Sequence, residues 1–385
     1  MSTEIEVSFV MPCLNEAETL EACIEAAKRC ISENMLSAEI VIADNGSVDG
    51  SQAIAERCGA RVVSVATRGY GAALSGGFAA ARGRYLVMGD ADQSYDFGEA
   101  MPMIEKLRAG ADLVMGSRFR GHIEKGAMPW SHRWIGNPVL SFVGRMFFQS
   151  RVSDFHCGLR AFTRETFTSL HIRTTGMEFA TELIVKATAA GMRIEEVPIT
   201  LHPDGRSRPP HLRTWHDGWR HLRFMLILSP RFVLFIPGLV MMAVGGSLVI
   251  RLSLGPLDVG FATLDVHSMQ LASVFVLIGY QAVTTAIAAR IYAVAEEIGP
   301  PAPLMQRAFA YFTLERGLLA GFALALIGLA AVGSAAIDWA RGGFGPLVPS
   351  VTMRPVVFGT TLIALGTQTL LMSILYSMLG IRRMR

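Results

Sequence analysis

The second half of this 385-residue sequence is short of charge. Acidic and basic residues concentrate before residue 230, and four later stretches carry charge only at their ends. These stretches lie near residues 232–252, 268–290, 316–338 and 355–381. Each exceeds the roughly 20 apolar residues that a helix needs to cross a bilayer. A buried helix of a soluble protein would usually keep a polar face, so we expect four transmembrane helices.

Cysteine and net charge are scarce as well. The five cysteines all lie before residue 158, and none has the paired spacing of a metal site. This pattern favours reduced thiols over disulfides or structural zinc. A formal net charge of +3 is too small to indicate a nucleic-acid partner. Arginine and histidine do crowd residues 202–223, where an anionic lipid surface is the natural partner.

The distribution of Lys and Arg predicts the orientation of the helices. Arg290, Arg307 and Arg316 share one connecting loop and three more arginines end the chain, whereas residues 252–267 contain neither Lys nor Arg. Arg341 is the main exception. The first residues lack the basic start and cleavage site of a signal peptide. Because basic loops stay in the cytoplasm, we expect an integral multi-pass membrane protein with its large N-terminal region and both termini cytoplasmic.

Short apolar runs alternate with helical segments in the N-terminal region. The runs lie at residues 6–11, 38–43, 61–66, 85–88 and 112–116. Such alternation is typical of a mostly parallel, Rossmann-like α/β sheet covered by helices on both faces. We expect this α/β domain over residues 1–210, a juxtamembrane amphipathic helix at 211–230 and an all-α membrane domain of four helices at 231–385.

Polar clusters follow the strands, at residues 12–16, 44–49, 90–96 and 117–120. Ligands of open α/β sheets bind at the carboxyl ends of the strands, so these clusters should converge on one site. Asp90 and Asp92 would repel each other unless a divalent cation that also binds diphosphate oxygens lay between them. The same tripeptide could equally cap the following helix. A glycine-rich turn at 68–71 could approach an anion, but Leu74 replaces the third glycine of a dinucleotide-binding motif.

Several motifs carry a resemblance to a known family. They are Pro12-Cys-Leu-Asn15-Glu16, Asp44-Asn45-Gly46-Ser47-x-Asp49, Asp90-Ala91-Asp92 and Gly116-Ser117-Arg118-Phe119. In these the sequence resembles family 2 glycosyltransferases of the GT-A fold, and among them the polyprenyl-phosphate sugar synthases of the dolichyl-phosphate mannose or glucose synthase type. Segments 154–160, 176–182 and 205–208 are also similar to that family, so the resemblance covers residues 5 to about 230.

The resemblance implies a role for each matched residue. The donor, a nucleotide diphosphate sugar, would be bound by Pro12, Asn15, Glu16, Asp44, Asn45, Ser47, Arg68, Asp90, Ala91, Asp92 and Gln93. Asp90 and Asp92 would hold Mg²⁺ or Mn²⁺, and with Arg118 they are the candidate catalytic residues. The acceptor phosphate would be bound by Arg118, Arg133, Arg160, Arg206, Ser207 and Arg208.

The sequence departs from the family at two points. The family commonly has Gln four residues after the first Asp of the metal motif, but here that residue is Ser94, next to Gln93. The third metal ligand therefore stays open. The Gln-x-x-Arg-Trp motif of processive polysaccharide synthases is absent, which disfavours chain extension.

Aromatic and basic residues mixed over residues 129–149 predict a helix lying at the membrane surface, with an ordinary core helix as the alternative. We therefore expect inverting, metal-dependent transfer of a hexose to undecaprenyl or dolichyl phosphate at the cytoplasmic membrane face. UDP-glucose is the favoured donor and GDP-mannose the second. One alternative acceptor is a diacylglycerol or glycolipid hydroxyl, which needs a base such as Asp154 or Glu178. A non-catalytic scaffold or transporter is a further alternative, and a homo-oligomer stays open.

Overall fold

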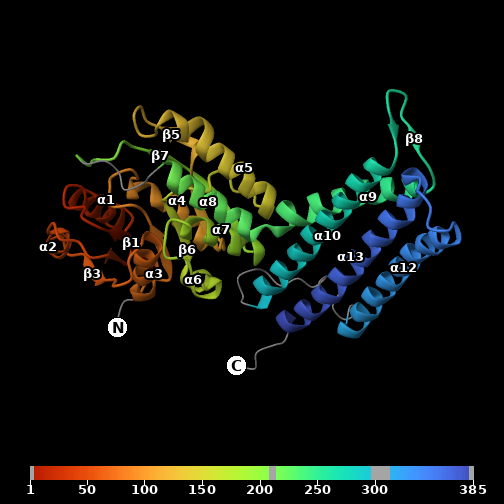
Figure 1. The fold of residues 1–385 in the computed structure, drawn as a ribbon. Helices are drawn as coiled ribbons and strands as arrows, with labels where there is room; N and C mark the ends of the chain where they lie inside the picture. Colours follow the sequence, from red (N-terminus) through yellow and green to blue (C-terminus); the bar gives the residue numbers. More distant parts are fainter. Residues whose placement is uncertain (1–3, 208–213, 296–312, 381–385) are drawn as a thin grey trace. The chain divides into compact units, whose positions relative to one another are not determined.

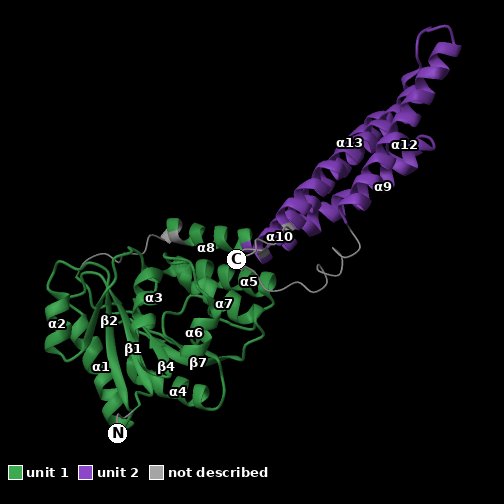
Figure 2. Ribbon diagram, turned by 90° about the horizontal axis from the view of Figure 1, so that it is seen from below, with its two compact units in different colours: residues 1–227 green, residues 228–385 purple. Residues whose placement is uncertain are grey.

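A computed structural model describes residues 4–207, 214–295 and 313–380 of the chain (Figure 1). The chain divides into two compact units, Met1–Ile227 and Leu228–Arg385, which Figure 2 colours separately. The first unit combines strands with helices, and the second is almost entirely helical. We describe each unit by itself.

A seven-stranded sheet forms the centre of the first unit. Its strands are β1 (Val7–Cys13), β2 (Ala38–Asp44), β3 (Arg61–Ser64), β4 (Tyr85–Met88), β5 (Leu113–Ile123), β6 (Arg160–Thr163) and β7 (Ile194–Leu201). They are ordered β3-β2-β1-β4-β6-β5-β7. Strand β6 runs antiparallel to both neighbours, and the other pairs are parallel. The predicted mostly parallel α/β sheet is confirmed.

Helices cover both faces of this sheet (Figure 1). In chain order they are α1 (Leu20–Glu33), α2 (Ser51–Arg57), α3 (Tyr70–Ala80), η1 (Phe97–Ala100), α4 (Met101–Arg108), η2 (His132–Gly136), α5 (Asn137–Phe148), α6 (Arg164–Leu170), α7 (Phe179–Ala189) and α8 (Thr214–Leu228). Strand β5 runs past its expected end at Gly116, because β7 pairs with it on both sides of an irregularity between Ser117 and His122.

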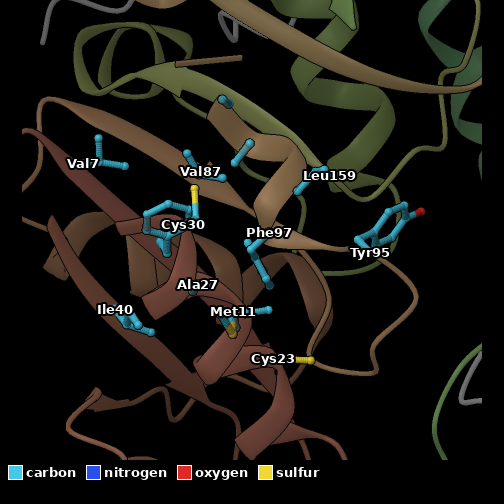
Figure 3. Packing of buried hydrophobic residues seen from close by; sticks show 14 of the residues in the cluster. Val7, Met11, Cys23, Ala27, Cys30, Ile40, Val87, Tyr95, Phe97 and Leu159 are labelled. Atoms are coloured by element: carbon cyan, nitrogen blue, oxygen red, sulfur yellow. The ribbon is translucent and has the colours of Figure 1, made fainter. Parts of the chain in front are cut away.

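Alternating side chains of β1 divide the core between the two faces. Phe9 and Met11 pack with α1, η1 and α4, and part of this cluster appears in Figure 3. Val10 points into the opposite cluster with α3 and α7. All five cysteines are buried free thiols, as expected. Burial raises the pKa of Cys23, and likewise that of Cys157, to about 12, so these thiols stay protonated.

Within the described residues, four helices of the second unit are long and apolar enough to cross a membrane. Its described elements are η3 (Arg231–Phe235), α9 (Ile236–Ser253), β8 (Leu257–Asp258), β9 (Thr263–Leu264), α10 (Val266–Ala295), α12 (Leu314–Arg341) and α13 (Pro349–Gly380). The candidate spans cover residues 231–253, 266–294, 314–341 and 349–379. The expected four apolar helices are confirmed in the part of the chain that the structure describes. The short strands β8 and β9 lie between α9 and α10, and the last helix starts earlier than the sequence indicated.

Close backbone contacts at glycines and a hydrogen bond between hydroxyl side chains join these helices. A Cβ atom on Gly238 of α9 would lie 2.7 Å from the carbonyl oxygen of Gly279 of α10, so the two backbones approach closely. Gly328 of α12 meets Gly359 of α13 in the same way. Helices α10 and α13 share a hydrogen bond of 2.7 Å between the hydroxyls of Ser273 and Thr361. Small residues and interhelical hydrogen bonds are what holds helices together where lipid removes the hydrophobic driving force.

Candidate functional site

The turns after β1 and β2 are hydrogen-bonded to each other at the carboxyl edge of the sheet. The Oδ1 atom of Asn15 accepts a hydrogen bond of 2.8 Å from the amide of Val48, and the Asn15 amide donates to Ser47. The amide of Glu16 donates to the Ser51 hydroxyl at the start of α2. Asn15 has a φ of 58°, in the left-handed region that Asn tolerates. The first two predicted motifs therefore form one continuous surface, with Pro12 in the last part of β1.

Asp44 and Asn45 are both buried at the end of β2. Asp44 accepts from Nε2 of Gln52 at 2.6 Å and from the amides of Gly46 and Ser47. Asn45 donates to the carbonyls of residues 65 and 67 and accepts from the amide of residue 69. Asn45 thus shapes the loop that carries Arg68, which is exposed. The side-chain amide of Asn45 therefore makes its hydrogen bonds within the protein and not to a nucleobase.

The carboxylate pair follows β4 as expected. Oδ1 of Asp90 accepts a hydrogen bond of 2.9 Å from the hydroxyl of Tyr70. Gly158 lies against Oδ2 of Asp90, since a Cβ atom at that glycine would be 2.6 Å away. Burial, and after it the charge of Asp92, raise the pKa of Asp90 to about 7. Two enclosed carboxylates that resist ionising together need a positive partner.

These carboxylates suit a hard divalent cation, which takes oxygen ligands. No group of three or more His, Cys, Asp and Glu able to hold a metal occurs within residues 4–207, 214–295 and 313–380. Asp90 and Asp92 would then be the protein ligands, and a diphosphate and water would complete the shell. The Ser94 amide donates to Asp92, and the Gln93 side chain lies against Gly205. Ala91 is buried, and its carbonyl accepts from Thr19.

Residues 205–207 contact the segment that carries Asp90 and Asp92. Nη2 of Arg206 is 3.1 Å from Oδ2 of Asp92, and its Nε donates to Oε2 of Glu16 at 2.8 Å. Ser207 donates through its amide and its hydroxyl to Glu18. Arg206 therefore binds the carboxylates of Glu16 and Asp92 in the predicted donor site, a contact that the sequence did not predict. Arg208 lies outside the described residues.

Arg118 and Asp154 form a buried ion pair. Nε and Nη2 of Arg118 each lie 2.7 Å from an oxygen of Asp154. Arg118 is 8% exposed and Asp154 is fully buried. Such bidentate geometry fixes the plane of the guanidinium group. Asp154 therefore fixes the side chain of Arg118. The same segment, 154–158, contacts Asp90 through Gly158.

The position of Arg160 does not fit its expected role at the acceptor phosphate. Arg160 is fully buried, and its three guanidinium nitrogens donate to the carbonyls of Phe155, Cys157 and Ala180. Its guanidinium group holds residues 154–160 against α7. We therefore no longer expect Arg160 to bind the acceptor phosphate. Arg133 lies on η2, with its guanidinium carbon 5.7 Å from the centre of the Trp134 ring.

Two side chains near the site had no predicted role. Tyr70 contacts Asp90, and His156 lies between Asp154 and Gly158 with its ring 4.6 Å from that of His221 of α8. The signal for His156 was its place inside the 154–160 segment, which resembles the family. The signal for Tyr70 was its place between the two glycines of the turn that opens α3.

The family models "Glycosyl transferase family 2" and "Glycosyltransferase family 2 C-terminal transmembrane region" match residues 8–170 and 287–380. The low-salt glycan biosynthesis hexosyltransferase Agl6 of Haloferax volcanii is 36% identical over 375 residues, covering 97% of this chain and 89% of Agl6. Glycosyltransferase AglJ of the same organism is 31% identical, covering 57% of this chain and 70% of AglJ. Glucosyl-3-phosphoglycerate synthase from Mycobacterium tuberculosis, solved with Mn²⁺, UDP and glucosyl-3-phosphoglycerate, matches at a TM-score of 0.46 and 24% identity, covering 58% of this chain and 78% of that structure.

Proposed function

Because this chain belongs to glycosyltransferase family 2 and is a membrane-associated glycosyltransferase, we propose that it transfers a hexose from a nucleotide diphosphate sugar to polyprenyl phosphate at the cytoplasmic membrane face. One observation carries the proposal. The Asp90 and Asp92 pair, which follows β4, contacts Arg206 and the 154–158 segment, whose Asp154 holds Arg118. The name of Agl6 supports a hexose and a role in glycan biosynthesis. UDP-glucose is the favoured donor, GDP-mannose the second.

An exposed apolar stripe supports a membrane acceptor. Trp130 just before η2, Trp134 on η2 and Phe142 on α5 are 68%, 64% and 56% exposed. Val139 and Met146 are exposed beside them. The inner face of α5 instead packs through Gly144 against Phe155. A stripe of this kind, flanked by arginines, suits a helix lying in the headgroup layer of a bilayer.

The acceptor phosphate would supply its own nucleophile. The second pKa of a phosphate monoester is about 6, so its oxygen is largely ionised at neutral pH. The enzyme then has to align this oxygen behind the anomeric carbon and stabilise charge with its arginines. Mg²⁺ or Mn²⁺, held by Asp90 and Asp92, would neutralise charge on the diphosphate. Direct displacement would invert the anomeric centre.

The paired state of two carboxylates argues against a hydroxyl acceptor. A diacylglycerol or glycolipid hydroxyl needs a base, for which Asp154 and Glu178 were the candidates. Asp154 is bound to Arg118, and Glu178 accepts from Arg220 at 2.8 and 2.9 Å. Although burial opposes it, hydrogen bonding from Arg220 holds the pKa of Glu178 below its ordinary value, which makes it a poor base.

The test uses the full chain in lipid nanodiscs. Labelled UDP-glucose and GDP-mannose are each supplied with undecaprenyl phosphate, with diacylglycerol or without acceptor, in Mg²⁺, Mn²⁺ or chelator. We expect an inverted, lipid-linked hexose only with the lipid phosphate and a divalent cation. Asp92→Ala should abolish transfer, whereas Glu105→Gln on the exposed face of α4 should not. Product on diacylglycerol, or none on undecaprenyl phosphate, would overturn the proposal.

A further inference from the structure

His156 is a side chain that the proposed reaction does not yet use. Its Nδ1 and Nε2 atoms are both covered by protein, and neither has a hydrogen-bond partner among the described residues. The residue as a whole is nevertheless partly exposed. Covering a polar atom without a partner costs free energy, and such atoms in a folded protein call for an explanation. A ligand that supplies the missing partner is one such explanation.

Charged and hydrogen-bonding groups surround His156. The ring of His221 stands edge-on to it, at an interplanar angle of 81°, and Nδ1 of His221 lies 3.0 Å from the Thr181 hydroxyl. Burial, followed by the charges of His221 and Arg118, holds the pKa of His156 well below its ordinary value. The ring is then neutral at pH 7, with one nitrogen donating and the other accepting.

Arg118 and His156 are both hydrogen-bonded to Asp154. The ion pair with Asp154 uses Nε and Nη2 and leaves Nη1 without a hydrogen bond among residues that the structure describes. The amide of His156 donates to the same Asp154 carboxylate at 3.3 Å. One carboxylate therefore holds both the guanidinium group and the backbone of His156.

Two amphipathic helices pack on the segment that carries His156. From α5, Ser141 accepts a hydrogen bond from the Phe155 amide at 3.3 Å. From α8, His221 contacts His156, and Met225 lies in the same hydrophobic cluster as Phe155. Both helices also carry exposed aromatic residues, Phe142 on α5 and Trp219 on α8. A lipid lying along these helices would have its phosphate group near residues 154–158.

We propose that His156 recognises the acceptor phosphate by donating a hydrogen bond to one of its non-reacting oxygens, beside Arg118. The inference rests on the proposed function and deepens it. The proposal requires the imidazole to rotate about χ2, a soft torsion, so that one of its covered ring nitrogens reaches the phosphate. His221 supports the ring from α8. Phosphate oxygens accept hydrogen bonds from both a neutral imidazole and a guanidinium group.

The test separates phosphate recognition from other effects in full-length enzyme. Binding of farnesyl phosphate and of farnesol is measured by calorimetry without donor, and KM values for undecaprenyl phosphate and for the nucleotide sugar are measured in nanodiscs. His156→Ala should weaken farnesyl phosphate binding and raise the acceptor KM about tenfold or more, as for loss of a hydrogen bond to a charged group. Farnesol binding and the donor KM should change by less than about twofold.

Matched variants complete the design. His156→Gln keeps an N–H donor and should retain most of the acceptor affinity, and it carries the test should the alanine variant not fold. His122→Gln, at an exposed position of β5, should behave as wild type. Equal weakening of farnesol and farnesyl phosphate, or an unchanged acceptor KM, would overturn the inference. Wild-type enzyme that forms no product on undecaprenyl phosphate would instead overturn the proposed function.

Discussion

Tyr70 donates its phenolic hydrogen to Oδ1 of Asp90 across 2.9 Å. The glycines on either side of Tyr70 make this contact feasible. A Cβ atom on Gly69 would lie 2.2 Å from the carbonyl oxygen of Thr175, and Gly71 is enclosed by the same strip of backbone. The glycine-rich turn that opens α3 therefore packs against residues 174–176. This packing holds Tyr70 within hydrogen-bonding distance of Asp90.

Removing this hydroxyl tests its role in holding Asp90. Tyr70→Phe should weaken Mn²⁺ binding in the presence of a nucleoside diphosphate by about tenfold or more, since a hydrogen bond to a charged group contributes about 1.5–3 kcal/mol. Electron paramagnetic resonance of free Mn²⁺ reports the binding directly. Tyr292→Phe, at an exposed position, is the matched control. Unchanged Mn²⁺ affinity in Tyr70→Phe would show that Asp90 keeps its orientation unaided.

The buried pair of Arg118 and Asp154 predicts a large effect on stability. Asp154→Asn leaves the Arg118 charge uncompensated and should lower the free energy of unfolding by about 3–5 kcal/mol. The double variant Arg118→Met with Asp154→Leu should recover much of this stability but no activity. Chemical denaturation and the transfer assay measure the two effects. Were Asp154 a catalytic base instead, Asp154→Asn would lose activity at unchanged stability.

His156 predicts a dependence of stability on pH. Its pKa in the folded protein lies below the ordinary value of 6.5, so below pH 6.5 the unfolded chain binds more protons than the folded one. Stability should therefore fall on acidification, by up to about 1.4 kcal/mol per pH unit for this group. Unfolding of wild type and His156→Gln at pH 7.5 and 5.5 measures it. The variant should lose less stability than wild type between these two pH values. Equal losses would contradict a lowered pKa of His156 in the folded protein.

The arginine distribution predicts the topology of the membrane helices. Green fluorescent protein fused after Arg385 should fluoresce, because the basic C-terminal tail is expected in the cytoplasm. Alkaline phosphatase inserted between β8 and β9, at residues 259–262, should be active, because that loop is expected on the opposite side. The reverse pattern of activities would invert the orientation and place the catalytic unit outside.

Local patterns in the sequence were enough for much of this protein. Apolar runs followed by polar clusters predicted the strands β1, β2 and β4 and the residues at their ends, because strand and turn preferences act over a few neighbouring residues. The four apolar helices followed from length and composition alone. The position of the carboxylate pair could be predicted because Asp90 and Asp92 come directly after a hydrophobic run.

Contacts between distant residues decided the rest. Strand β6 has only four residues and enters the sheet between β4 and β5, a pairing that no local periodicity indicates. Arg206 bonds to Glu16 across 190 positions, and His221 reaches His156 from a helix that precedes the membrane unit. Arg160 matched a family motif, yet packing encloses it and directs its charge to backbone carbonyls. Sequence specifies which side chains can ionise or donate, but the free energy of burying each one depends on the partners that the whole fold brings to it.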